Sequence, residues 1–182
     1  MTEERKRHHE IAERLPLDAA STWVEVGVYR GDTTSKVSKA RPLARVVGVD
    51  PWLSPLGTGN TFGANDVDMA TKPQAQFERW YQETKTKLMR FGSRVRIMRL
   101  ASVAAAAELR EQRFDLVFID GDHSYEACAA DIAAWRGLVR EGGWLGGHDY
   151  AKARFPGVTQ AVDEVFPAGV VRGADSTWWV RV

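Results

Sequence analysis

The segment VEVGVYRG at residues 24–31 constrains the fold of this 182-residue chain more than any other. An apolar run ends in Glu25 and Gly27, a second glycine follows at Gly31, and a helical pattern begins directly after it. A strand, a tight turn and a helix N-terminus in this order bring the backbone close to a nucleotide-like ligand. The segment therefore predicts the first strand and first helix of an α/β fold, with a ligand at their junction.

A second apolar run follows about twenty residues later and ends in Asp50. A carboxylate at the end of the second strand can accept hydrogen bonds from both hydroxyls of a ribose. The glycine turn and this acid together predict an adenosine-containing ligand at one edge of the sheet.

Strand-like apolar runs alternate with helical patterns along the remaining chain. We expect strands at 23–27, 45–49, 95–99, 114–119, 144–147, 169–171 and 178–182, and helices at 33–39, 74–90, 103–110, 125–139 and 158–165. This alternation predicts a Rossmann-like, doubly wound, mostly parallel seven-stranded sheet with helices on both faces. A short link joins the last two strands, which should pair antiparallel, so that one strand is reversed. Residues 1–21 are expected to form a helical segment ahead of the sheet.

The composition limits the class of protein. A length of 182 residues fits one domain, 1–182. Lys plus Arg is 25 and Asp plus Glu is 24, so the charge balance favours neither nucleic acid nor an anionic membrane as a partner. Cys128 stands alone, which excludes an internal disulfide and fits a reducing compartment. No apolar run approaches the ~18 residues of a membrane span, and we expect a soluble, cytoplasmic protein.

Residues 51–73 interrupt the alternation, with three glycines, two asparagines and little periodicity. A loop of this length inside a compact domain is usually functional. It follows the strand that ends at Asp50, so we interpret it as a lid over the ligand; a plain surface insertion is the alternative.

Polar residues follow the fourth and fifth expected strands. Asp120 ends the fourth strand, and His148 and Asp149 end the fifth. These strands are neighbours in doubly wound sheets, so the three side chains could converge on one point and hold a divalent cation with open positions. Hydrogen bonding to a ligand or substrate without a metal is the alternative.

His123 lies three residues after Asp120, where the next helix should begin. At that place an imidazole can take up a proton at neutral pH without being a metal ligand. Ser124 and Asp122 have a simpler explanation, because their side chains can cap the helix N-terminus.

These motifs resemble the class I S-adenosylmethionine-dependent methyltransferases. The resemblance rests on VEVGVYRG, VDPW at 49–52, FIDGDHSY at 118–125, HDY at 148–150 and the segment PGV…AVD at 156–163. It extends over nearly the whole chain from Thr22. More narrowly, the chain is similar to the small subgroup of macrocin- and mycinamicin-type sugar O-methyltransferases, and distantly to catechol O-methyltransferase.

The resemblance implies a role for each motif. Glu25, Gly27 and Gly31 would surround the methionine part of S-adenosylmethionine, Asp50 would hold the ribose, and Ser102 would lie near the adenine. Asp120 would bind both the cofactor and a metal, and Asp149 would complete the metal site. His123 falls where related enzymes carry the general base. His148 departs from the pattern, because many relatives have a carboxylate there, which leaves Mg²⁺, Mn²⁺ or no metal open.

The resemblance also implies a reaction, namely O-methyl transfer to a small hydroxylated acceptor such as a sugar, a natural product or a phenol. A nicotinamide-dependent oxidoreductase is the first alternative, although the turn lacks the Gly-x-Gly-x-x-Gly spacing that meets a pyrophosphate. A non-catalytic binding module is the second alternative. Methylation of base amines is disfavoured, because no Asn-Pro-Pro-Tyr-like stretch follows the fourth strand. Trp178 and Trp179 of the last strand should point to opposite faces, one into the core and one covered by a helix or by a partner chain, which is compatible with a homodimer.

Overall fold

A seven-stranded sheet forms the centre of the computed structural model, which describes residues 4–56 and 67–182. The strands are β1 (Ser21–Val26), β2 (Ala44–Val49), β3 (Val95–Met98), β4 (Phe114–Ile119), β5 (Val139–Gly147), β6 (Val171–Arg172) and β7 (Trp178–Arg181). Their order is β3-β2-β1-β4-β5-β7-β6, and β7 alone runs against the others within this sheet. The sequence prediction of a mostly parallel sheet with one reversed strand is confirmed.

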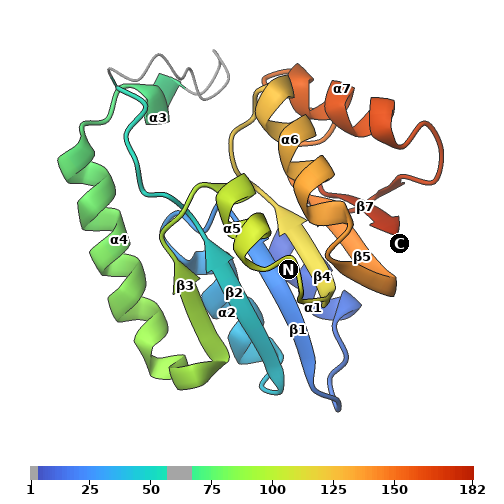
Figure 1. Cartoon of the computed structure of the whole chain (residues 1–182), viewed down its shortest axis with the longest axis horizontal. Coiled ribbons are helices and arrows are strands. Elements are labelled where there is room, and N and C mark those ends of the chain that lie inside the picture. The colour runs from blue at the N-terminus through green and yellow to red at the C-terminus, as the bar shows by residue number, and fades with distance from the viewer. Residues whose placement is uncertain (1–3, 57–66) are drawn as a thin grey trace.

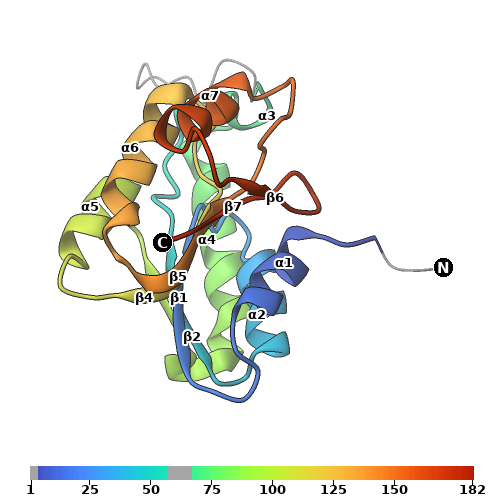
Figure 2. The same cartoon turned by 90° about the vertical axis from the view of Figure 1, so that its right-hand side faces the viewer.

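Helices cover both faces of the sheet (Figures 1 and 2). On one face lie α5 (Ser102–Glu108), α6 (Tyr125–Arg136) and α7 (Pro156–Val165); on the other lie α1 (Arg7–Arg14), α2 (Asp32–Ala40) and α4 (Gln74–Leu88). The short α3 (Val67–Ala70) precedes α4, and the 3₁₀ helix η1 (Met89–Arg94) follows it. Each connection between parallel strands thus returns over one face, as the alternating sequence predicts.

The core has two main parts, one on each face of the sheet. Strand residues such as Val24, Val117 and Leu145 pack against α5, α6 and α7, whereas Trp23 and Phe118 pack towards α1 and α2. This division explains the near-continuous apolar strands, because both faces of a parallel sheet are covered.

Helix α1 is anchored on the sheet by an arginine. The Arg14 guanidinium lies 4.0 Å from the ring centre of Trp179 and 5.1 Å from that of Trp144. Trp178 and Trp179 are both buried, on opposite faces of the sheet. Of the two coverings expected for the second tryptophan, a helix or a partner chain, the structure has the helix, α1, and this argument for a homodimer no longer applies.

Two predicted boundaries also differ from the structure. The helix expected at 125–139 ends at Arg136, and β5 begins at Val139 rather than at Trp144. Gly142 and Gly143, which precede the strand expected at 144–147, lie inside β5, where the pairing with β4 shifts its register. Gly142 has φ +72°, so the strand passes through an irregularity that a side chain would disfavour.

The predicted lid at 51–73 falls partly on residues 57–66, which lie outside the described residues. Within the described part of the chain, no helix is long and apolar enough to cross a membrane.

Candidate active site

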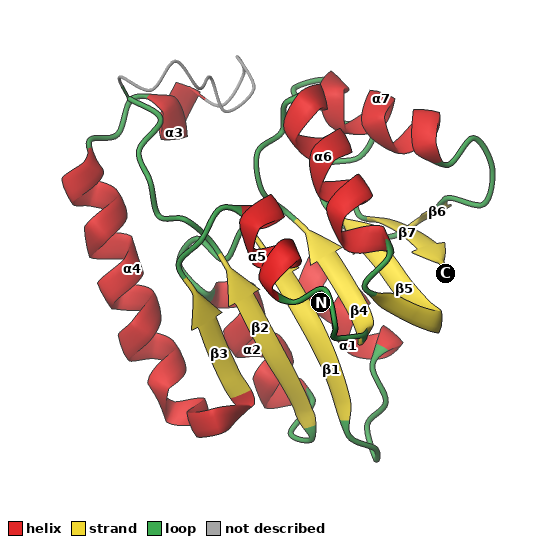
Figure 3. Ribbon diagram, viewed as in Figure 1, coloured by secondary structure: helices red, strands yellow, loops and turns green. Residues whose placement is uncertain are grey.

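A cavity of about 630 Å³ opens at the carboxyl ends of the parallel strands. The strands β1 to β5 run in the same direction (Figure 3), and residues at or just after the end of each of them line the cavity. Polar groups are costly to bury inside strands and therefore collect where the strands end. The cavity is the place where open α/β sheets bind their ligands.

The glycine turn after β1 packs directly on the end of β4. Gly27 has φ +87°, and a Cβ added there would lie 2.0 Å from the carbonyl oxygen of Asp120. No side chain fits at this position, so the turn presents bare backbone to the cavity. Gly31 also has a positive φ, of 71°, but its Cα faces Thr84 and Leu88 of α4 rather than the cavity.

Glu25 lies below the turn and is buried, with its carboxyl group bonded to the hydroxyl of Thr34. Burial raises the pKa of Glu25 to about 8, despite the opposing hydrogen bond from Thr34. It lines a second, smaller cavity of about 300 Å³ that adjoins the first at Gly27, Tyr29 and Asp120. Glu25 lines the smaller cavity and Gly27 lines both, whereas Gly31 lines neither, although its neighbours Arg30 and Asp32 line the smaller one.

Asp50 lines the main cavity at the end of β2. Its Oδ2 accepts from the backbone N–H of Tyr29 at 2.8 Å, and its Oδ1 accepts from that of Trp52 at 2.7 Å. Burial raises its pKa, although these two N–H groups oppose the shift. Each carboxylate oxygen has a second lone pair, so the fixed carboxylate can still accept two hydroxyls from a ligand.

Three residues with left-handed backbone line this cavity without being glycine, namely Tyr29 (φ 50°), Trp52 (φ 43°) and Asp149 (φ 61°). Such a conformation costs of order 1–3 kcal/mol and persists where the surroundings impose it. Nothing in the sequence signals this strain. Its concentration here is typical of a functional site.

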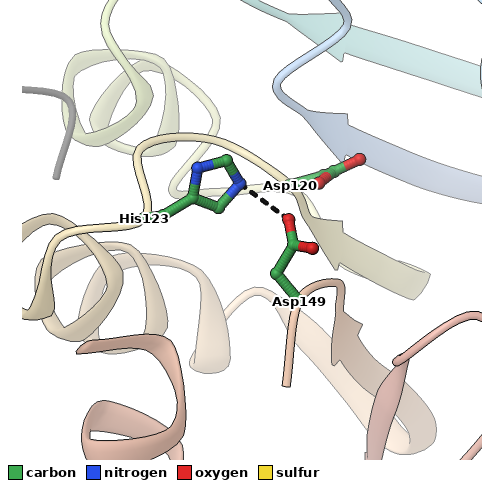
Figure 4. Close-up of side chains that lie close together, drawn as sticks. All are labelled: Asp120, His123 and Asp149. Carbon is green, nitrogen blue, oxygen red and sulfur yellow. Dashed lines mark ion pairs between the residues drawn. The ribbon is translucent and has the colours of Figure 1, made fainter. Parts of the chain in front are cut away.

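Asp120, His123 and Asp149 come together on one side of the cavity (Figure 4). Nε2 of His123 lies 2.8 Å from Oδ2 of Asp149, and one ligand atom from each of the three residues lies within 4.8 Å of the others. The His123 ring also stacks on Phe155, with ring centres 4.1 Å apart. The convergence of Asp120 and Asp149 follows the sequence prediction, and His123 approaches them more closely than expected.

His148 is buried among three carboxylates. Its Nδ1 lies 3.4 Å from Asp120 and 3.1 Å from Asp149, and its Nε2 lies 3.6 Å from Asp175. Burial opposes protonation, but Asp120 and Asp149 outweigh it and raise the pKa of His148 to about 9. Within the described residues, neither ring nitrogen has a hydrogen-bond partner of good geometry. At neutral pH the ring is thus a cation that balances the carboxylates.

Two further cations reach the same carboxylates, and sequence reasoning missed both. Arg7 of α1 pairs with Oδ2 of Asp120, and Lys152 lies 2.5 Å from Oδ1 of Asp149. Although burial favours the neutral acids, these cations and the histidines hold the pKa of Asp120 and of Asp149 below the usual range. Arg7 gave no signal, because it belongs to a charged N-terminal run. Lys152 could have been found by its position three residues after Asp149.

Ser124 caps α6, as expected, whereas Asp122 bonds to the chain just ahead of the helix. The hydroxyl of Ser124 accepts from the N–H of Ala127, and Asp122 accepts from the N–H of Ser124 at 2.8 Å. Ser102 begins α5 and lines the cavity, where its hydroxyl accepts from Nε1 of Trp135 at 2.8 Å.

The donor set of Asp120, His123 and Asp149 fits a divalent ion. Two carboxylates and one imidazole with open positions suit Mn²⁺ and related transition metals, and carboxylates with water suit Mg²⁺. The His148 ring is not part of this three-residue group. The metal assignment of Asp120, His148 and Asp149 stays a prediction.

Comparison with known proteins assigns the family. Residues 24–150, more than half of the chain, match the family described as "Methyltransferase domain". An uncharacterized protein, R132, of Acanthamoeba polyphaga mimivirus is 26% identical over 149 residues, which are 79% of this chain. This chain spans 58% of the length of that relative.

Solved methyltransferase structures share the fold. The O-methyltransferase NovP superposes with a TM-score of 0.70 at 17% identity, over 96% of this chain and 78% of NovP. CalS11, described as TDP-rhamnose 3'-O-methyltransferase of calicheamicin biosynthesis, gives a TM-score of 0.65 at 18% identity, over 94% of this chain and 76% of CalS11. The family match and the sequence motifs agree, and the chain belongs to the methyltransferase domain family.

Proposed function

We propose that the protein transfers a methyl group from S-adenosylmethionine to a hydroxyl group of a small acceptor, such as a sugar, a natural product or a phenol. One observation carries the proposal: the imidazole of His123 and the carboxylates of Asp120 and Asp149 share one wall of the cavity that Asp50 and the Gly27 turn also line. A proton acceptor thus lies beside the expected cofactor site. The neighbours NovP and CalS11, which are described as O-methyltransferases, support the same reaction.

Residues at three strand ends would hold the cofactor. Asp50 would hold the ribose hydroxyls and Ser102 would lie near the adenine. The methionine part would cross the bare backbone of Gly27 towards the smaller cavity, which Glu25 lines. The sulfonium supplies the driving force for methyl transfer, and the protein supplies orientation and electrostatics.

We assign His123 the role of the base that accepts the proton from the acceptor hydroxyl. Its Nε2 contacts Asp149 in the structure, so the hydroxyl must replace this contact before Nε2 can receive the proton. Catalytic hydrogen bonds often form only in the substrate complex. Stacking on Phe155 fixes the plane of the ring, and therefore the direction of its Nε2.

A divalent ion would be held by Asp120 and Asp149, and it would make a bound hydroxyl more acidic. Nε2 of His123 can serve as a metal ligand or as the base, but not as both at once. We assign it the base, and the metal-binding measurement described in the Discussion tests this separation.

The experiment compares wild type with His123→Ala, by following formation of S-adenosylhomocysteine with a panel that contains catechol and a nucleotide-linked deoxysugar. We expect turnover to fall by about 10²–10⁴-fold, the usual contribution of a general base, while the calorimetric Kd for S-adenosylhomocysteine changes less than threefold. Tyr125→Phe is the control, because this neighbour bonds to Glu164 outside the cavity. Unchanged turnover in His123→Ala would disprove the base assignment, and a wild type that binds no S-adenosylhomocysteine would disprove the function.

A further inference from the structure

Asp50, the acid expected to hold the ribose, is oriented by two backbone N–H groups. Its oxygens accept from Tyr29 at 2.8 Å and from Trp52 at 2.7 Å. Both donors have left-handed backbone, with φ of 50° and 43°. A residue other than glycine keeps this conformation only where its surroundings impose it. Other residues must therefore hold the two donors in place.

The carbonyl group of Tyr29 is held by two side chains at once. Nε1 of Trp52 and Oγ1 of Thr84 each donate to this oxygen at 2.8 Å. Trp52 is 1% exposed, and Thr84 is fully buried. A residue has only two free backbone dihedral angles. Because the carbonyl of Tyr29 is fixed, the direction of the N–H that it donates to Asp50 is limited as well.

Thr84 donates outside its own helix. A threonine within a helix can donate to a carbonyl of the preceding turn, and Thr86 does so, with its Oγ1 3.0 Å from the carbonyl oxygen of Gln82. The hydroxyl of Thr84 instead leaves α4 and reaches Tyr29, 55 positions away in the sequence. A Cβ added at Gly31 would lie 3.1 Å from Cγ2 of Thr84. Thr84 therefore contacts the glycine turn with both its hydroxyl and its methyl group.

Helix α4 also holds the segment that carries the second donor to Asp50. Nε2 of Gln74, in the first turn of α4, donates to the carbonyl of Trp52 at 3.0 Å. Oε1 of the same side chain accepts from the N–H of Ser54 at 2.8 Å. Gln74 and Thr84 lie roughly three turns apart on one helix. A single rigid element thus contacts both of the segments that donate to Asp50.

We infer that α4 positions the carboxylate of Asp50 for the ribose, with Thr84 fixing the donor in the glycine turn and Gln74 fixing the donor after β2. This inference rests on the proposed function, because it requires a ligand that carries a ribose. Thr84 lines neither cavity and acts through Tyr29, so it is a positioning residue. A carboxylate that is oriented before binding lowers the cost of ordering the site around its ligand.

The test is calorimetric binding of S-adenosylhomocysteine and of its analogue that lacks both ribose hydroxyls. Wild type should bind the analogue about 10–100-fold more weakly, because hydrogen bonds to a charged acceptor are lost. Thr84→Val keeps the shape of the side chain and removes its hydroxyl. This preference should then fall at least about fivefold, since S-adenosylhomocysteine loses affinity while the analogue changes less than about twofold.

Two further variants serve as controls. Thr86→Val makes the same change at an exposed position of α4 and should keep the wild-type preference. Thr84→Ser retains the hydroxyl and should restore most of the preference. Amide hydrogen exchange without ligand adds a second measurement. The N–H of Tyr29 should exchange at least about fivefold faster in Thr84→Val, whereas that of Val117, in the centre of the sheet, should not change.

The ratio between the two ligands separates positioning from a merely structural role, which would weaken both ligands equally. A full preference in Thr84→Val, or an equal loss for both ligands, overturns the inference. If Thr84→Val does not fold, Gln74→Ala, at an exposed position, decides by the same ratio. Wild type that binds both ligands equally would also overturn the inference, because Asp50 would then not hold the ribose. Wild type that binds neither ligand would instead refute the proposed function.

Discussion

Asp120 and Asp149 are surrounded by positively charged side chains. Arg7 contacts one oxygen of Asp120, Lys152 contacts one oxygen of Asp149, and the protonated ring of His148 lies between the two residues. Truncating one partner of such a buried network leaves an uncompensated charge. A divalent ion would bind the same carboxylate oxygens of Asp120 and Asp149. It must therefore compete with the positively charged side chains that contact these oxygens.

Metal binding tests which side chains hold the ion. We expect wild type with S-adenosylhomocysteine to bind one Mn²⁺, measured by electron paramagnetic resonance, and Asp149→Asn to weaken this binding by at least about tenfold. His148→Gln should change the affinity much less, because the ring is outside the three-residue group. His123→Ala should also retain Mn²⁺ if its ring is the base.

Glu164→Gln, an exposed carboxylate on α7, is the control for loss of charge. A loss of Mn²⁺ in His148→Gln as large as that in Asp149→Asn would return His148 to the ligand set. A loss in His123→Ala would make His123 a ligand instead of the base.

In the turn between β1 and α2, the backbone approaches the end of β4 closely because Gly27 has no side chain. Gly27 lies against Asp120, and the backbone of both strands therefore reaches the edge of the cavity. Positive φ and lack of space act together at Gly27, whereas a Cβ added at Gly169 (φ +88°) would meet nothing within 4 Å.

Gly27→Ala should therefore destabilise the fold far more than Gly169→Ala. A left-handed alanine costs roughly 1–2 kcal/mol, and the collision with Asp120 should bring the loss at Gly27 to more than about 3 kcal/mol. Urea unfolding of both variants measures the difference. Equal losses at the two positions would mean that the turn can move away from β4.

The strands and their polar ends could be predicted from the sequence, because apolar runs stop abruptly at residues such as Asp50 and Asp120. β5 was the exception, since Gly142 and Gly143 have the composition of a turn but lie within a strand that tolerates them at an irregular register. The contribution of α1 was also missed. Arg7 acts through a contact between residues more than a hundred positions apart, which no local pattern encodes.

Stability of the whole molecule depends on several buried ionisable groups near the sheet edge. Glu25, Asp131 and His148 all bind protons more tightly in the folded chain than in the unfolded chain. For such groups the folded state is favoured at low pH, and the advantage is lost as the pH rises through the folded-state pKa.

Glu25 should contribute to this dependence over the whole range between about pH 4.5, its ordinary pKa, and about pH 8, its pKa in the fold. Over this window the contribution to the free energy of unfolding should fall by roughly 1.4 kcal/mol per pH unit. Glu25→Gln keeps the shape of the neutral acid and should remove that part of the slope in urea unfolding at a series of pH values. A slope that is the same in both proteins would show that Glu25 is ionised in the fold.

Helix α1 contacts both the sheet and the candidate site. Arg14 packs on Trp144 and Trp179 of the sheet, and Arg7, two turns earlier, pairs with Asp120. Any polypeptide attached ahead of α1, whether a natural extension or a purification tag, enters the chain a few residues from that contact. Assays on N-terminally tagged protein would therefore report on the tag as well as the enzyme, and a C-terminal tag avoids this ambiguity.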